Sequence, residues 1–190
     1  KLSNISRALG ENIPLIKTEN RLSRNLAAED FTEAVNESIL RDAARRVMRD
    51  TVIAVDIGDV QKPYAKKMEH LAHVRDGSEN EIGPGYWLLN AVAADVDGND
   101  VTPLWGELFS TKENAIKSEN IRLLHAIDKI GAHCGTNGIY TIDRGGDRKR
   151  ILWPLLSNSR RFLIHMRGDR FAHEGRDTGR GERMANIAGR

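Results

Sequence analysis

The sequence predicts an α/β fold in which a helical N-terminal segment precedes three strands joined by short turns, followed by alternating helices and strands. Three observations predict it. Apolar residues recur three or four positions apart before residue 50. Short runs rich in β-branched residues begin at Thr51. Hydrophobic residues make up 39% and charged residues 29% of the sequence, which is an ordinary composition for a globular protein. The 190 residues are enough for one domain with a core.

Helical patterns come first. Residues 1–26 are predicted to form short helices broken at Pro14, and residues 28–49 form a clearer helix. Asp30 is predicted to be the N-cap of that helix, with Glu33 completing a capping box. We interpret residues 1–49 as a helical segment. One interpretation of this segment is that it forms the end of a DNA-binding region.

Strand patterns follow. Residues 51–57 predict a buried strand, and residues 86–96 and 101–110 predict two more. Turn-forming residues fill 75–85 and 97–100. Three consecutive strands with short connections predict an antiparallel meander.

Helices and strands then alternate. Residues 117–131 predict a helix, 138–143 a strand, 147–157 a helix disturbed by Pro154, and 161–166 a last strand.

The complete order, three strands and then helix, strand, helix, strand, is that of the ribonuclease-H-like fold. We expect residues 50–168 to form this core. Residues 169–190 form a tail that is rich in Gly and Arg, and we expect it to be a loop or an element cut off from its packing partner.

Some residue types are expected to be structural. Cys134 is the only cysteine, which excludes an internal disulfide and fits a cytoplasmic setting. No apolar run is long enough to span a bilayer, so no membrane association is expected. The six histidines lack zinc-like spacing. The three tryptophans fall within predicted elements and are expected in the core; they are Trp87, Trp105 and Trp153.

Charge is unevenly distributed. Residues 1–143 contain 17 Lys/Arg and 22 Asp/Glu, whereas residues 144–190 contain 12 Lys/Arg and 5 Asp/Glu. A basic end beside an acidic body indicates a polyanionic partner and a site where carboxylates gather, although a solvated tail gives the same pattern.

Two aspartates are the candidate catalytic residues. Asp56 is predicted at the end of the first strand and Asp143 at the end of the fourth. If those strands are parallel neighbours, both carboxylates lie at one edge of the sheet, where oxygen ligands favour Mg²⁺ or Mn²⁺. The alternative is that both aspartates cap strand-to-loop turns.

Residues 52–169 resemble the DDE transposases of bacterial insertion sequences. The resemblance is carried by VDIGDVQKPY at 55–64, KKMEHL at 66–71, DGS at 76–78, GY at 85–86, TIDRG at 141–145 and RFLIHMR at 161–167. It implies a bacterial, nucleoid-associated enzyme that cleaves DNA at transposon ends and transfers strands. It also implies double-stranded DNA as partner and a homodimer as the active complex.

The resemblance implies that Asp56 and Asp143 are the first two acids of a metal-binding triad. The third acid of the family is a glutamate on a later helix, and no such stretch is found here. Glu174 and Glu182 lie downstream, in surroundings that do not predict a helix. We therefore expect the chain to stop before the third acid and to be a poor nuclease alone.

Basic residues near both aspartates are candidate contacts for DNA phosphates, which position a substrate without reading its sequence. For the three lysines, a charged connecting loop is the alternative. These residues are Lys62, Lys66, Lys67, Arg144, Arg148, Lys149 and Arg150.

Two other functions remain open from the sequence. Asp56-Ile57-Gly58 and Asp143-Arg144-Gly145-Gly146 are similar to the phosphate-binding turns of sugar kinases and actin-like ATPases, which share the core strand order. A non-catalytic DNA-binding protein derived from a transposase would also retain both aspartates.

Overall fold

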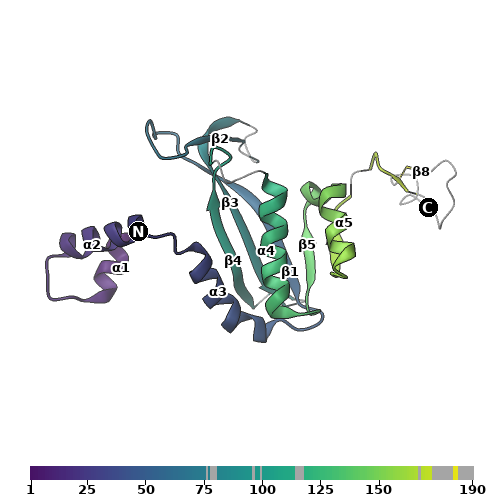
Figure 1. Ribbon diagram of the computed structural model, residues 1–190, viewed down its shortest axis with the longest axis horizontal. Helices are drawn as coiled ribbons and strands as arrows, with labels where there is room; N and C mark the ends of the chain where they lie inside the picture. The colour runs from purple at the N-terminus through teal and green to yellow at the C-terminus, as the bar shows by residue number, and fades with distance from the viewer. Residues whose placement is uncertain are drawn as a thin grey trace. The chain divides into compact units, whose positions relative to one another are not determined.

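The computed structural model describes residues 1–75, 77, 81–95, 97–98, 100–113, 118–166, 168–172 and 182–183 (Figure 1). The chain divides into two compact units, residues 1–38 and residues 39–190. None of the helices in the described ranges has the length and apolar character needed to cross a bilayer.

The first unit contains the two short helices predicted before residue 26. α1 spans Leu2–Leu9 and α2 spans Leu15–Ala28, with Pro14 directly before α2, which confirms the predicted break. Gly10 ends α1 in the left-handed conformation (φ 57°), which glycine adopts without a steric penalty.

The helix predicted over 28–49 is shorter than expected. α3 spans Thr32–Ala43, and a 3₁₀ turn (η1) continues it over Ala44–Arg46. The prediction that Asp30 is the N-cap is wrong by one residue, because Val35 N donates the first helical bond to Phe31 O. The Asp30 carboxylate instead accepts a bond from Thr32 N at 2.9 Å, so it still satisfies one of the helix's free N–H groups.

The second unit is built on a mixed, open, six-stranded sheet, which confirms the predicted α/β class. Its main order is β4-β3-β1-β5-β6, antiparallel from β4 to β1 and parallel from β1 to β6. Short β2 pairs with the start of β3. The strands are β1 Val52–Gln61, β2 Ala72–Arg75, β3 Ile82–Ala94, β4 Val101–Phe109, β5 Ile139–Ile142 and β6 Phe162–Ile164.

Two strands extend beyond their predicted ends. β1 continues to Gln61 instead of stopping near residue 57, and β3 begins at Ile82, inside the stretch predicted as loop. Gly85 pairs with Gln61 on one side and with Ala72 on the other. The ladders to β1 and β2 therefore hold Gly-Pro-Gly residues in a strand against their local preference for a turn.

The stretch after residue 168 is not entirely loop. β7 (Phe171–Ala172) and β8 (Glu182–Arg183) form a two-stranded antiparallel ladder, so the loop alternative does not hold for these four residues. Glu174, one of the two downstream acids, lies outside the described residues.

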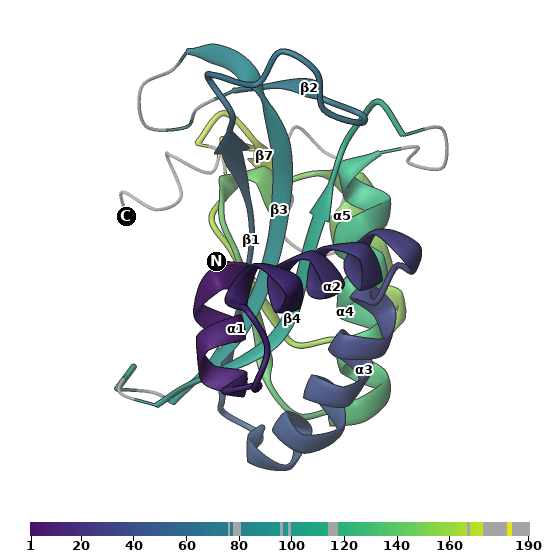
Figure 2. The same cartoon turned by 90° about the vertical axis from the view of Figure 1, so that its left-hand side faces the viewer.

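Helices α4 (Glu119–Cys134) and α5 (Lys149–Ser157) lie on one face of the sheet (Figures 1 and 2). Ser118 caps α4 by accepting a hydrogen bond from Ile121 N, and the helix runs past its predicted end at residue 131 to Cys134, with Gly135 as its C-cap. The side chains of Leu40, Ala43 and Val47 also enter this core, so the end of the N-terminal helical segment packs with the sheet unit. The largest fully buried core residues include Ile53, Leu89, Leu104, Phe109, Ile127, Ile130, Tyr140, Ile151 and Leu155.

β4 contains a bulge that turns two successive side chains toward the helices. Trp105 pairs with Ala91 and Pro103 with Val92, so Leu104 has no partner residue of its own in β3. Leu104 and Trp105 are both buried as a result.

The tryptophans and Cys134, which were expected to be structural, differ in their exposure to solvent. Trp105 is buried, whereas Trp153 is 65% exposed on α5, so the prediction that it lies in the core is wrong. Burial raises the pKa of the Cys134 thiol and raises the pKa of Tyr140 to about 12, which keeps both groups neutral at physiological pH.

Candidate functional site

Asp56 lies on β1 beside Asp143, which directly follows the neighbouring parallel strand β5. β1 and β5 pair from Val52 with Ile139 to Val55 with Ile142, so the next residues in register are the two aspartates. Adjacent strands are about 4.8 Å apart. Asp56 is not at a strand end as predicted, because β1 runs on past it; it is instead the first residue of β1 beyond the end of β5.

A hollow of about 130 Å³ lies at this position, next to the start of α4. Asp56 and Asp143 both line it, together with side chains from α4 and from the turn after β5. Both aspartates are exposed to solvent. The other lining residues with polar side chains are Glu119, Asn120 and Arg148.

The turn after β5 fixes the Asp143 carboxylate. Its Oδ1 accepts a hydrogen bond from Gly145 N at 2.8 Å, and its carbonyl accepts one from Gly146 N. Four residues after Asp143, the buried Asp147 carboxylate accepts a bond from Arg170 Nε at 3.0 Å. This ion pair joins the turn to the segment that follows β6, so the turn is held from both sides.

Replacing Gly145 with Ala is expected to weaken Mn²⁺ binding about 10-fold while leaving thermal unfolding nearly unchanged. A methyl group at Gly145 would lie 2.8 Å from Asp143 Oδ1 and would force that carboxylate to rotate. Gly58→Ala on β1 is the control, because a methyl group there meets nothing within 4 Å. Equal Mn²⁺ affinities of the two variants in a calorimetric titration would contradict this role for the turn.

The predicted basic residues fall into two separate places. Arg148 lines the hollow, and its Nη1 donates a hydrogen bond to Asn120 Oδ1 at 3.2 Å. Arg144, Lys149 and Arg150 are exposed nearby, in the 3₁₀ turn η2 (Arg144–Gly146) and at the start of α5, but they do not line the hollow.

The three predicted lysines lie farther away, on the loop between β1 and β2. Lys62 follows β1 directly, six residues beyond Asp56 along the strand. At about 3.3 Å per residue, this corresponds to roughly 20 Å. Lys66 and Lys67 are exposed on the same loop. The structure therefore does not gather the lysines and Arg148 into one cluster.

Three residues of the site were not identified from the sequence. Glu119 and Asn120 reach the hollow because α4 runs back from the edge of the sheet where β4 ends. His165 follows β6 and lines a second, open hollow that also contains both aspartates. The signal was present in the predicted topology, since a helix between the third and fourth strands must begin at the edge where Asp56 lies.

The arrangement brings together two carboxylates, Asp56 and Asp143, rather than three. Within the part of the chain that the structure describes, no three His, Cys, Asp or Glu side chains are close enough to hold one metal ion together. Glu119 therefore lies at the wall of the hollow and not in a ligand set with the aspartates.

No family model matches the sequence, and no curated protein is significantly similar to it. The site must therefore be interpreted from its own geometry.

Another hollow, of about 440 Å³, is lined by Arg46, Arg49 and Asp50, but neither Asp56 nor Asp143 lines it.

Proposed function

We propose that this chain is a ribonuclease-H-like catalytic core of a DNA transposase, which cleaves phosphodiesters with Mg²⁺ or Mn²⁺. The observation that carries the proposal is the parallel register of β1 and β5, which brings Asp56 beside Asp143. The strand order β4-β3-β1-β5-β6 supports it, because a transposase of this type has its first two acids on neighbouring strands of such a sheet.

The donor atoms at the site fit a hard divalent cation. Asp56 and Asp143 offer exposed carboxylate oxygens, the ligands that Mg²⁺ and Mn²⁺ prefer. Such ions, when bound, would activate the attacking oxygen and stabilise the leaving oxygen of an in-line displacement. Arg148, held by Asn120, would donate hydrogen bonds to a phosphate in the hollow.

The reaction assigned to this site is hydrolysis followed by transfer. The oxygen of a water molecule forms a bond to phosphorus, and the bond from phosphorus to the 3′ oxygen breaks. The products are a 5′ phosphate and a free 3′ hydroxyl. That hydroxyl then attacks a phosphodiester of the target DNA, displacing another 3′ oxygen.

An ATP-binding function is less well supported. Sugar-kinase-like phosphate binding needs a turn after the first aspartate, so that backbone N–H groups face the phosphates. Gly58 is instead a strand residue paired with Leu88 in the middle of β1. The non-catalytic DNA-binding alternative is separated from the proposal by experiment.

The test is nicking of supercoiled plasmid by an excess of the purified chain with Mn²⁺. We expect slow nicking that is lost in Asp56→Asn and in Asp143→Asn. Asp59→Asn is the matched control, since Asp59 lies on the same strand but does not line the hollow. Nicking that survives both site substitutions contradicts the proposal, and DNA binding without any metal-dependent nicking favours the non-catalytic protein.

A further inference from the structure

The loop between β1 and β2, residues 62–71, displays an aromatic ring. Tyr64 is 95% exposed, more than any other large apolar or aromatic side chain in the described residues. We propose that this loop binds DNA by stacking an unpaired base on Tyr64, while the adjacent lysines contact neighbouring phosphates. The inference rests on the proposed function, because that function makes DNA the substrate.

The near end of the loop is fixed to the sheet. Lys62 N donates a hydrogen bond to Pro84 O at 2.7 Å, which extends the pairing of β1 with β3 by one residue. Ala65 N donates to Lys62 O at 2.9 Å and closes a turn with Pro63 and Tyr64 at its tip. A proline next to the tyrosine limits the freedom of this turn, so less entropy is lost when a base binds.

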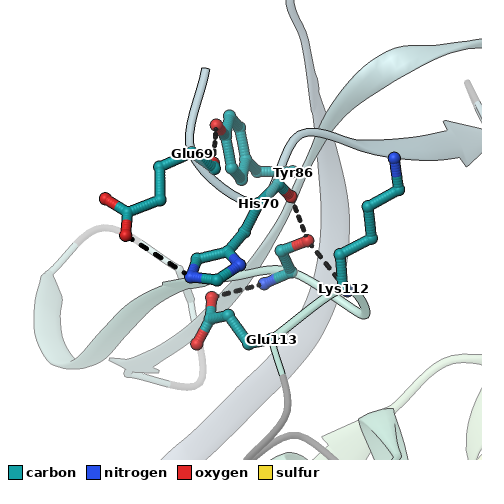
Figure 3. A network of polar contacts seen from close by, with 6 residues as sticks. Glu69, His70, Tyr86, Lys112 and Glu113 are labelled. Carbon is teal, nitrogen blue, oxygen red and sulfur yellow. Dashed lines mark hydrogen bonds and ion pairs between the residues drawn. The ribbon is translucent and has the colours of Figure 1, made fainter. Parts of the chain in front are cut away.

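The far end is held by a polar network (Figure 3). Tyr86 OH donates to Glu69 O at 2.6 Å, and Ser110 Oγ donates to His70 O. Ser110 is buried, and its backbone N–H donates to Glu113 Oε1 at 3.0 Å. These bonds attach the loop to β3 and to the end of β4, and they hold His70 at a positive φ of 51°. The loop is therefore anchored to the sheet at both of its ends, with Tyr64 between them.

Charge on the loop favours a polyanion. Lys62, Lys66 and Lys67 form no ion pair with another described residue. The one acid of the loop, Glu69, points its Oε1 toward His70 Nε2 at 3.6 Å. An exposed ring beside lysine side chains is the combination that binds single-stranded nucleic acid, since bases stack on the ring and cations contact phosphates.

The base must be unpaired because a paired base inside a duplex is already stacked on both faces. A ring on a loop tip then meets only the backbone or the groove edges. Tyr64 therefore selects single-stranded DNA or an extruded base. The lysines, by contrast, attract single and double strands alike.

The test measures DNA affinity by fluorescence anisotropy in EDTA, so that no cleavage occurs. Three probes of one sequence are used: a single strand, the perfect duplex, and the duplex with one unpaired 2-aminopurine. We expect Tyr64→Ala to weaken binding of the single strand and of the bulged duplex about 10-fold. Binding of the perfect duplex is expected to stay the same. Tyr64→Phe should restore the affinity, because it keeps the ring and removes only the hydroxyl.

Quenching of 2-aminopurine reports stacking directly and should disappear in Tyr64→Ala. Lys66→Ala should weaken all three probes and reduce the salt dependence on the single strand by about 0.7 in the log–log slope. Three results would overturn the inference: no change in Tyr64→Ala, an equal loss on the perfect duplex, or a Tyr64→Phe variant as weak as Tyr64→Ala.

Failure here is distinct from failure of the proposed function. The loop begins roughly 20 Å along β1 from Asp56, and Mn²⁺ affinity can be measured on the same samples. Unchanged DNA binding in Tyr64→Ala with normal Mn²⁺ binding rejects the stacking role alone. Loss of Mn²⁺ binding in Asp56→Asn with normal DNA binding leaves the loop proposal intact.

Discussion

Replacing Asp56 with Asn is expected to weaken Mn²⁺ binding at least about 100-fold, equivalent to close to 3 kcal/mol. The substitution removes one of the two carboxylates that would hold the proposed ion, and an amide oxygen carries no charge to replace it. Asp143→Asn should behave in the same way, because the register places the two carboxylates side by side and the proposed ion would contact both. Electron paramagnetic resonance of free Mn²⁺ measures the affinity.

The same change should have the opposite effect without metal. Two adjacent carboxylates repel each other when no cation lies between them, so Asp56→Asn should unfold at an equal or higher temperature in EDTA. At 100 times the wild-type dissociation constant, Mn²⁺ should stabilise the wild type by about 2.7 kcal/mol. At that concentration the variant gains only about 0.4 kcal/mol.

Asp59→Asn is again the control, since this carboxylate lies on β1 outside the hollow. If Asp59→Asn and Asp56→Asn lower the Mn²⁺ affinity equally, the ion is held by general negative charge and not by the aspartate pair.

Arg122→Met is expected to cost about 2–3 kcal/mol of unfolding free energy. Glu107 is only 7% exposed, and its Oε1 accepts from Arg122 Nη1 at 2.9 Å. Its Oε2 accepts from Trp105 Nε1 at 3.3 Å. Removing the arginine leaves a buried carboxylate with the tryptophan as its remaining partner among these contacts. Urea denaturation measures the loss.

The double variant Glu107→Leu, Arg122→Met distinguishes this explanation from simple loss of packing. Both charges are then absent, and apolar side chains of similar size fill the space between β4 and α4. We expect stability within about 1 kcal/mol of the wild type, because burial of an ion pair brings little net gain. A double variant as unstable as Arg122→Met would mean that shape, and not charge, decides stability here.

Patterning predicted the parts of the fold whose local preferences agree with their surroundings. The strands near residues 52, 139 and 162 are short β-branched runs, and the antiparallel meander and later alternation are confirmed. Errors arose where long-range pairing overrode local chemistry. Residues 83–85 look like a turn but are held in β3 by pairing with β2, and Gly85 pairs with β1 as well. β2 was missed because four residues are too few to show a pattern.

The aspartate pair was predictable because it needed only two strand positions and their relative direction. Asn120 and Glu119 were not identified, because the predicted topology gives the edge at which α4 begins but not which of its side chains face the hollow. Trp153 was assigned to the core by its residue type, yet it points outward. A helix places side chains by angle, and a single tryptophan does not fix that angle.

The bulge at Leu104 affects how β4 tolerates insertions and deletions. β4 contains one residue more than the opposite part of β3 requires, and the extra side chain fills the core. Deleting Leu104 would leave every other pairing of the ladder intact and would create a cavity of leucine size. Deleting a residue between Trp105 and Glu107 would instead send one of these two side chains to the opposite face. The number of residues at the bulge is therefore set by the volume that Leu104 fills in the core. Beyond the bulge, the number of residues is set by the alternation of side chains between the two faces of the strand.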